Sequence, residues 1–238
     1  MQQYFINETT DINFTIIFNN EQSHHIAHVL RMKVSDKVIV ATVDKKRFIV
    51  EITEIGNNVN ARCIERINDN TSSCDVVLVL ALLKKDKWDY ALQKATELGA
   101  TKIVPLVTSR TVVKLNDEKS DKKLARWNKI VLEACEQSLR GDLCEVLNPI
   151  AINEINDYTQ DVNLVAYEKE DSSFNIGKYV IKDKSVMIVI GPEGGFDNSE
   201  IEKMRNMGID GCSLGNSILR AETACLYALS IIKHINEV

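Results

Sequence analysis

The sequence is poor in residues that break or crosslink a chain. Its 238 residues include three prolines and ten glycines, a composition that leaves little room for long disordered linkers. The six cysteines form no Cys-x-x-Cys pair and no Cys/His spacing typical of a metal site. We therefore expect reduced, mostly buried thiols in a cytosolic protein, and no bound metal.

Long apolar segments are also missing. The longest, residues 76–83, has the length of a strand and not of a membrane span. The first twenty residues carry no basic stretch of the kind that opens a signal peptide. His24 and His28 lie one helical turn apart, but no third ligand is near them, so they do not predict a metal site. These absences favour a cytoplasmic protein without membrane contact.

The charge is unevenly distributed. The net charge of the whole chain is −5, yet residues 84–140 hold ten lysines and three arginines against four aspartates and four glutamates, a net charge of +5. Residues 141–238 carry a net charge of −8. A local basic surface that binds nucleic acid is therefore compatible with an acidic protein, and a solvated helical face is the alternative. Aromatic residues make up 6% of the chain, which argues against binding mainly by base stacking.

The sequence pattern changes near residue 70. Before it, short runs of β-branched and aromatic residues alternate with turn-forming residues. This predicts a small antiparallel β-barrel in a domain of residues 1–72. The expected strands are residues 4–6, 14–18, 37–43, 47–55 and 59–67, with one helix at 21–30. The polar stretch 68–73 is typical of a linker.

Strands and helices alternate in residues 73–238, which predicts a second domain of the α/β class with a mostly parallel sheet. The expected strands are residues 76–83, 102–107, 162–167, 186–190 and 211–214; one helix follows the first of them and others cover 121–139, 199–207 and 221–235. Gly99, Gly141 and Gly208 are placed to end helices. Asp197 and Glu200 have capping-box spacing. Pro105 indicates an edge or irregular position in its strand.

Two glycine-containing loops are the strongest candidates for a ligand site. Residues 191–195 (GPEGG) follow an apolar strand directly, and residues 213–220 lead into the last helix. Ligands of open α/β sheets bind at the carboxyl ends of strands, where glycine lets the backbone approach a flat heterocycle. Tight strand-to-helix turns are the alternative. Neither GxGxxG nor GxxxxGK[ST] occurs, and Glu193 suits a polyphosphate poorly. A neutral adenine with a cationic sulfonium is more compatible.

Five segments resemble one known family, in order along nearly the whole chain. They are HHIAHVLRMKVSD (24–36), KATELGA (94–100), EACEQS (133–138), VIGPEGGF (189–196) and LGNSILRAETA (214–224). The sequence is similar to the bacterial 16S ribosomal RNA uridine N3-methyltransferases, which belong to the SPOUT class. The resemblance implies a PUA-like N-terminal domain, a trefoil-knotted C-terminal domain and a homodimer. It also implies methylation of N3 of a uridine in 16S rRNA of the small ribosomal subunit, with S-adenosylmethionine as the cofactor.

The resemblance places the cofactor between the loop after the strand at 162–167 and the two glycine loops. Its expected contacts are Tyr167, Gly191, Pro192, Glu193, Gly194, Gly195, Leu214, Gly215, Ser217, Ile218, Leu219, Arg220 and Thr223. Arg220 is the expected catalytic cation, which would hold a uracil oxygen or a neighbouring phosphate; a structural arginine paired with Glu222 is the alternative. Glu222 is a candidate catalytic base, or a carboxylate favoured at that position by the helix dipole.

Four further residues are candidates for RNA contact: His25, Arg31, Arg110 and Arg140. Arg140 is equally well explained as a cation at a helix C-terminus. Ser217 stands where the family usually has arginine. Two other functions remain open on the sequence alone. One is methylation of a different RNA atom, such as a ribose 2′-oxygen, and the other is a non-catalytic role in RNA binding or ribosome assembly.

Overall fold

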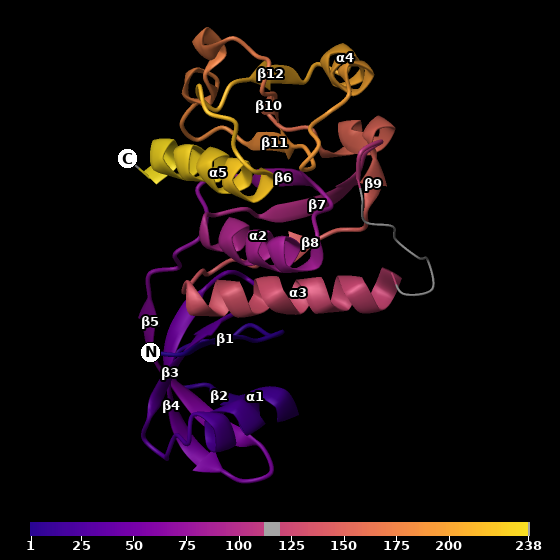
Figure 1. The fold of residues 1–238 in the computed structure, drawn as a ribbon. Helices are drawn as coiled ribbons and strands as arrows, with labels where there is room; N and C mark the ends of the chain where they lie inside the picture. Colours follow the sequence, from indigo (N-terminus) through magenta and orange to yellow (C-terminus); the bar gives the residue numbers. More distant parts are fainter. Residues whose placement is uncertain (112–119, 238) are drawn as a thin grey trace. The chain divides into compact units, whose positions relative to one another are not determined.

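The structure is a computed structural model that describes residues 1–111 and 120–237 (Figure 1). It contains two compact units. The first comprises Met1–Thr71 and Cys135–Asp142, and the second comprises Ser72–Ala134 and Leu143–Val238. Residues 112–119 of the predicted basic stretch at 84–140 lie outside the described residues.

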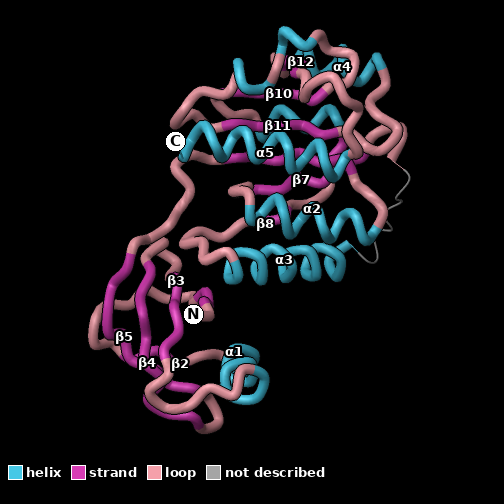
Figure 2. The backbone as a smooth tube through the Cα atoms, turned by 60° about the vertical axis from the view of Figure 1, so that its left-hand side comes forward, coloured by secondary structure: helices cyan, strands magenta, loops and turns pink. Residues whose placement is uncertain are grey.

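The first unit is built on a five-stranded sheet that curls around its own core (Figure 2). Its strands are β1 (Gln3–Phe5), β2 (Thr15–Ile17), β3 (Lys37–Ala41), β4 (Arg47–Ile55) and β5 (Val59–Ile67), in the spatial order β1-β3-β4-β5-β2. Neighbouring strands are antiparallel except β1 and β3, which are parallel. The predicted β-fold is confirmed, and β4 and β5 have the predicted bounds. The domain limits of residues 1–72 and 73–238 stay a prediction.

One helical segment interrupts these strands. Helix α1 (Asn20–His24) begins with a capping box between Asn19 and Gln22, and continues as a π-helical turn, His25–Val29. The ring nitrogen Nδ1 of His25 lies 2.8 Å from the Tyr4 hydroxyl. Burial raises the pKa of Tyr4, so the phenol stays neutral and can donate this hydrogen bond. The segment therefore packs against the start of the sheet through a polar contact as well as through its apolar residues.

Residues Cys135–Asp142 cluster with the first unit although they lie far along the chain. The Gln3 side-chain amide donates to the Arg140 carbonyl at 2.6 Å, and the Gly141 N–H donates to the Asn70 carbonyl at 3.0 Å. The prediction that Gly141 ends the preceding helix is wrong, because Leu139 is the residue with a left-handed backbone (φ 59°). Glycine is needed at 141 for space, since a Cβ there would overlap the Asp69 carbonyl.

The second unit contains a seven-stranded sheet in which every pair is parallel. Its strands are β6 (Val76–Ala81), β7 (Lys102–Val107), β8 (Glu145–Val146), β9 (Ile150–Ala151), β10 (Val162–Ala166), β11 (Val186–Ile190) and β12 (Asp210–Cys212). Their order is β12-β10-β11-β6-β7-β8, with β9 also paired to β7. The helices are α2 (Lys85–Glu97), α3 (Ser120–Gln137), α4 (Asn198–Asn206) and α5 (Ala221–Glu237). The predicted α/β class is confirmed.

The central strands are covered on both faces, as their continuous apolar sequences predict. Every residue of β6 and β11 is buried. On one face, Val77 and Val79 share a core with Ile201 and Met204 of α4. On the other, α5 packs against β11 and against α2 (Figure 2). None of the described helices is long and apolar enough to cross a membrane.

The pairing of strand β7 accounts for the proline at position 105. The predicted edge position is wrong, because β7 pairs with β6 on one side and with two short strands on the other. Strand β8 pairs with Lys102 and Ile103, and β9 pairs with Leu106 and Val107. The ladder on that side is therefore interrupted opposite Pro105, where a residue without an N–H is tolerated. The predicted irregularity is confirmed.

The ends of the helices around the sheet follow the predicted signals. Asp197 and Glu200 form the capping box that starts α4. Gly99 and Gly208 follow α2 and α4 with positive φ angles of 98° and 79°. After β12, the chain runs along the connection between β10 and β11, because the Ser213 N–H donates to the Phe174 carbonyl at 2.9 Å. The trefoil knot implied by the resemblance stays a prediction.

The contact between Gly141 and Asp69 generates a prediction about stability. Gly141→Ala should lower the opening free energy of the first unit by about 1–3 kcal/mol, because the added methyl must displace the Asp69 carbonyl. Hydrogen exchange of β4 and of residues 135–142 measures this. Gly56→Ala is the matched control, since a Cβ there would meet no atom closer than 3.9 Å. Equal exchange in the two variants would show that residues 135–142 are not held against the unit.

Candidate active site

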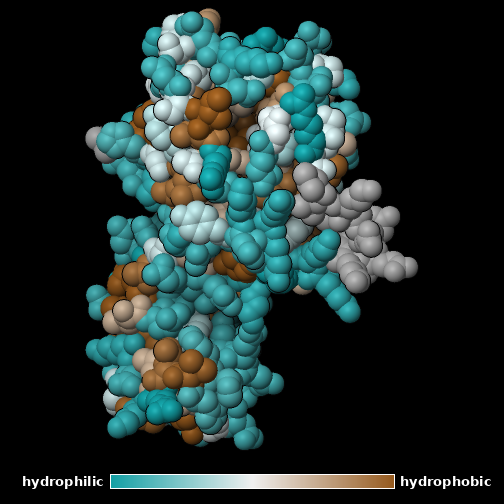
Figure 3. Space-filling view, viewed as in Figure 1, coloured by the Kyte–Doolittle hydropathy of each residue, from teal (hydrophilic) through white to brown (hydrophobic). Residues whose placement is uncertain are grey.

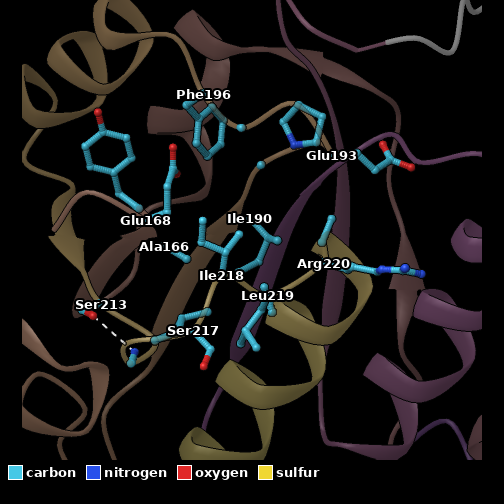
Figure 4. Close-up of a pocket in the computed structure, with 18 of the residues that line it drawn as sticks. Ala166, Glu168, Ile190, Glu193, Phe196, Ser213, Ser217, Ile218, Leu219 and Arg220 are labelled. Carbon is cyan, nitrogen blue, oxygen red and sulfur yellow. Dashed lines mark hydrogen bonds between the residues drawn. The ribbon is translucent and has the colours of Figure 1, made fainter. Parts of the chain in front are cut away.

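A cavity of about 390 Å³ lies at the carboxyl ends of β10, β11 and β12 (Figure 4). Its volume is within the range of roughly 300–1,000 Å³ that is usual for small-molecule sites. Three segments that are distant in sequence form its walls. The lining residues are Ala166, Tyr167, Glu168, Ile190, Gly191, Pro192, Glu193, Gly194, Gly195, Phe196, Ser213, Leu214, Gly215, Asn216, Ser217, Ile218, Leu219, Arg220, Ala221 and Ala224.

The loop after β11 is a tight turn in which two positions favour glycine. The Gly195 N–H donates to the Pro192 carbonyl at 2.9 Å, and Gly195 has a φ of 67°. A Cβ at Gly191 would lie 3.0 Å from the Phe196 ring. The loop therefore folds back on its own phenylalanine and exposes backbone at the cavity wall.

The loop after β12 is anchored at its start and open further along. Ser213 is buried, and its hydroxyl accepts a hydrogen bond from the Gly215 N–H at 3.2 Å. Gly215 has a φ of 106°, which favours glycine. Beyond it, the Ile218 side chain is 87% exposed although it borders the cavity. The loop thus presents apolar surface and backbone groups to a ligand.

The charged side chains near the cavity differ in whether they form ion pairs. Lys87 pairs with Glu193 at 3.3 Å and with Glu222 at 3.6 Å. Arg220 is exposed, and among the described residues its guanidinium has no hydrogen-bond or ion-pair partner. Arg220 and Glu193 extend from different loops toward the same side of the view in Figure 4. Arg220 is therefore free to bind an anion or a carbonyl oxygen.

The loop after β11 is also held from outside the cavity. The Arg110 guanidinium donates to the Gly194 carbonyl at 2.8 Å and lies 3.6 Å from the Asp197 carboxylate. The Ser109 N–H donates to the buried Glu200 carboxylate at 2.9 Å. These contacts tie the end of β7 to the glycine loop and to the start of α4.

Two thiols lie next to the cavity wall, and neither is suited to nucleophilic chemistry. Burial raises the pKa of Cys212 and that of Cys225 to about 12. Both therefore remain protonated near neutral pH, whereas a nucleophilic cysteine requires the thiolate. Among the described residues, no group of three or more His, Cys, Asp or Glu side chains could hold a metal ion.

Comparisons with known proteins agree over the whole chain. A model of an RNA methyltransferase domain matches residues 70–233, and a model of an RNA methyltransferase PUA domain matches residues 18–58. Ribosomal RNA small subunit methyltransferase E of Bacillus subtilis is 36% identical, with 100% of this chain and 98% of the relative covered. That of Rickettsia conorii is 34% identical, with 88% and 85% covered.

A solved structure supports the same relationship. The ribosomal RNA small subunit methyltransferase E of Neisseria gonorrhoeae, bound to S-adenosyl methionine, is 27% identical with a TM-score of 0.90. The comparison covers 99% of this chain and 98% of that one. The chain belongs to the ribosomal RNA small subunit methyltransferase E family.

Within this methyltransferase family member, the structure brings the predicted cofactor residues together. All of them except Thr223 line the cavity; Thr223 is exposed in the first turn of α5. Sequence reasoning missed Glu168 and Phe196, which also line it. Glu168 directly follows the predicted contact Tyr167, and Phe196 directly follows the predicted contact Gly195. Extending each predicted loop by one residue would have included both. The assignment of these residues to a cofactor stays a prediction.

The other predicted functional residues of this methyltransferase are dispersed. Glu222 is not among the lining residues, and its side chain pairs with Lys87. Arg140 is buried in an ion pair with Asp142 at 3.0 Å, a structural role close to the alternative stated for it. Arg31 is exposed in the first unit. The RNA contacts of Arg31, Arg140, His25 and Arg110 stay predictions.

Proposed function

We propose that the chain is an S-adenosylmethionine-dependent methyltransferase that modifies N3 of a uridine in 16S rRNA, in the cytoplasm. The observation that carries this proposal is the cavity formed by the two glycine loops at the strand ends. It occurs in a chain whose full-length relatives are named ribosomal RNA small subunit methyltransferase E, one of them solved with S-adenosyl methionine. The substrate is the RNA itself or the small ribosomal subunit that contains it.

The cavity suits the proposed cofactor in shape and charge. Ile190, Leu214 and Leu219 give it apolar walls, and the glycine loops offer backbone groups to a purine. Glu168 adds negative charge that complements a sulfonium cation. When bound, S-adenosylmethionine supplies an electrophilic methyl group. We propose that the lining residues predicted from the sequence, apart from the Arg220 side chain, hold it.

Arg220 is the residue to which we assign transition-state stabilisation. N3 of uridine carries a weakly acidic proton, which must leave for the nitrogen to form a bond to the methyl carbon. Negative charge then develops on the uracil oxygens, and a guanidinium at the cavity rim stabilises it. The methyl–sulfur bond breaks as the methyl–nitrogen bond forms, the sulfonium becomes a neutral thioether, and the N3 proton passes to solvent. Glu222 does not line the cavity, so we assign it no proton transfer.

The experiment that tests the function is methyl transfer from labelled S-adenosylmethionine to small ribosomal subunits that lack the modification. Nucleoside analysis of the 16S rRNA should then show N3-methyluridine. A 2′-O-methylated nucleoside would support the methyltransferase activity but contradict the assignment of N3 as the methylated atom. Binding of the cofactor without transfer to subunits or naked rRNA would overturn the assigned substrate, and failure to bind it would favour a non-catalytic role in RNA binding or assembly.

Substitution of Arg220 tests its proposed role. Arg220→Met should lower kcat by about 10²–10³-fold, the loss typical of removing one oxyanion-stabilising donor. Cofactor affinity and Tm should change little, because the side chain is exposed and lacks a partner within the described chain. Arg205→Met is the control, since Arg205 pairs with Glu170 outside the cavity lining. A loss of cofactor affinity with unchanged kcat would assign Arg220 to binding instead.

We further propose that the protein is a homodimer that uses the second unit as its interface. Large apolar side chains remain exposed there: Tyr90 on α2, Tyr227 on α5 and Ile218 at the cavity rim. The space-filling view shows hydrophobic residues among the hydrophilic ones of the surface (Figure 3), and exposed apolar surface commonly marks an interface. Sedimentation at micromolar concentration should show a dimer that Tyr227→Asp weakens. A wild-type monomer would contradict the proposal.

A further inference from the structure

Lys87 occupies an unusual position between two carboxylates from different loops. It lies in the first turn of α2, with its ammonium nitrogen 3.3 Å from Glu193 Oε1 and 3.6 Å from Glu222 Oε1. Glu193 follows β11 and lines the cavity, whereas Glu222 lies in the first turn of α5. One ammonium group therefore links the two segments that the proposed active site depends on.

Glu222 depends on this lysine more than Glu193 does. The Glu222 side chain is 15% exposed, against 32% for Glu193. Its second oxygen, Oε2, is buried and has no hydrogen-bond partner within the described part of the chain. A buried carboxylate without a partner is unfavourable and draws any cation within reach. Without Lys87, the Glu222 carboxylate would therefore pair with another cation.

Arg220 is the cation that the sequence places nearest to Glu222, two residues before it. Its side chain is exposed and has no partner among the described residues, although it borders the same cavity as Glu193. Guanidinium and carboxylate groups form strong hydrogen-bonded pairs. Loss of the lysine would therefore leave Arg220 as the cation nearest in sequence to the Glu222 carboxylate.

We propose that Lys87 is a positioning residue of the methyl-transfer site. It pairs with Glu222, the more buried of its two carboxylate partners, and so keeps that carboxylate from capturing the Arg220 guanidinium. Arg220 thereby stays available to the uracil oxygen. This inference rests on the proposed function in assigning Arg220 to the substrate, but the pairing of Arg220 can be measured without any methyl transfer.

The ion pairs of Lys87 contribute little to the stability of the fold. Its side chain and that of Glu193 are about one-third exposed, and ion pairs of this kind contribute little to folding. Lys94 offers a matched control on the same helix. It pairs with Glu97 at 2.7 Å, and its side chain is 32% exposed against 33% for Lys87. A general effect of losing a paired lysine from α2 should appear equally in both variants.

The decisive test compares Lys87→Met with the double variant Lys87→Met/Glu222→Gln. Lys87→Met should lower kcat about tenfold or more, the factor that corresponds to one charged hydrogen bond. Cofactor affinity should stay within about threefold and Tm within about 2–4 °C, the shift that about 1 kcal/mol produces in a chain of this size. The double variant should regain most of the lost kcat, because the carboxylate that captured Arg220 is now neutral. Lys87→Arg and Lys94→Met should resemble the wild type.

A second readout follows Arg220 directly. In ¹⁵N NMR, the Arg220 side-chain signal, assigned with Arg220→Lys, should shift and become protected in Lys87→Met but not in the double variant. The proposal is overturned if this signal is unchanged in Lys87→Met, if Lys94→Met loses as much activity, or if Glu222→Gln fails to restore it. If the wild type transfers no methyl group, the proposed function fails, and the NMR comparison still decides whether Lys87 controls the pairing of Arg220.

Discussion

The parallel direction of β6, β10, β11 and β12 is the constraint on which the candidate site depends. Parallel strands end at the same edge of a sheet, so the segments after β10, β11 and β12 meet there although they are distant in sequence. Burial of every residue in β6 and β11 holds these strands between the helices that cover the two faces of the sheet. The rigid sheet lets the loops carry the chemistry.

The loops themselves are positioned from several directions. Phe196 packs over Gly191 from within the loop after β11, Arg110 holds the Gly194 carbonyl from the end of β7, and Lys87 reaches Glu193 from α2. The loop after β12 is tied at Ser213 to the connection between β10 and β11. Its tip at Ile218 has no comparable burial. This contrast places rigidity at the strand ends and leaves an apolar rim exposed.

Most of the fold could be predicted from the sequence because its signals are local. The apolar run at residues 186–190 predicts the observed bounds of β11, and the capping residues predict the start of α4. The errors involve contacts between distant residues. Leu139, not Gly141, takes the left-handed backbone, and glycine is needed at 141 because of its close approach to the Asp69 carbonyl. No periodicity in residues 135–142 could show that they cluster with the first unit.

In the candidate site, too, local features could be predicted from the sequence and contacts between distant residues could not. Its loops are recognisable because glycines and strand ends leave a pattern, whereas the partner of each charged side chain is a tertiary property. The sequence makes Arg110 a candidate RNA contact, but it cannot show that the guanidinium donates to the Gly194 carbonyl. Glu222 looked like a partner for Arg220, yet the ammonium nitrogen of Lys87 lies 3.6 Å from it. Lys87 pairs with both carboxylates, and Arg220 has no partner in the described chain. An unpaired guanidinium at a cavity rim is available for charge that develops during a reaction.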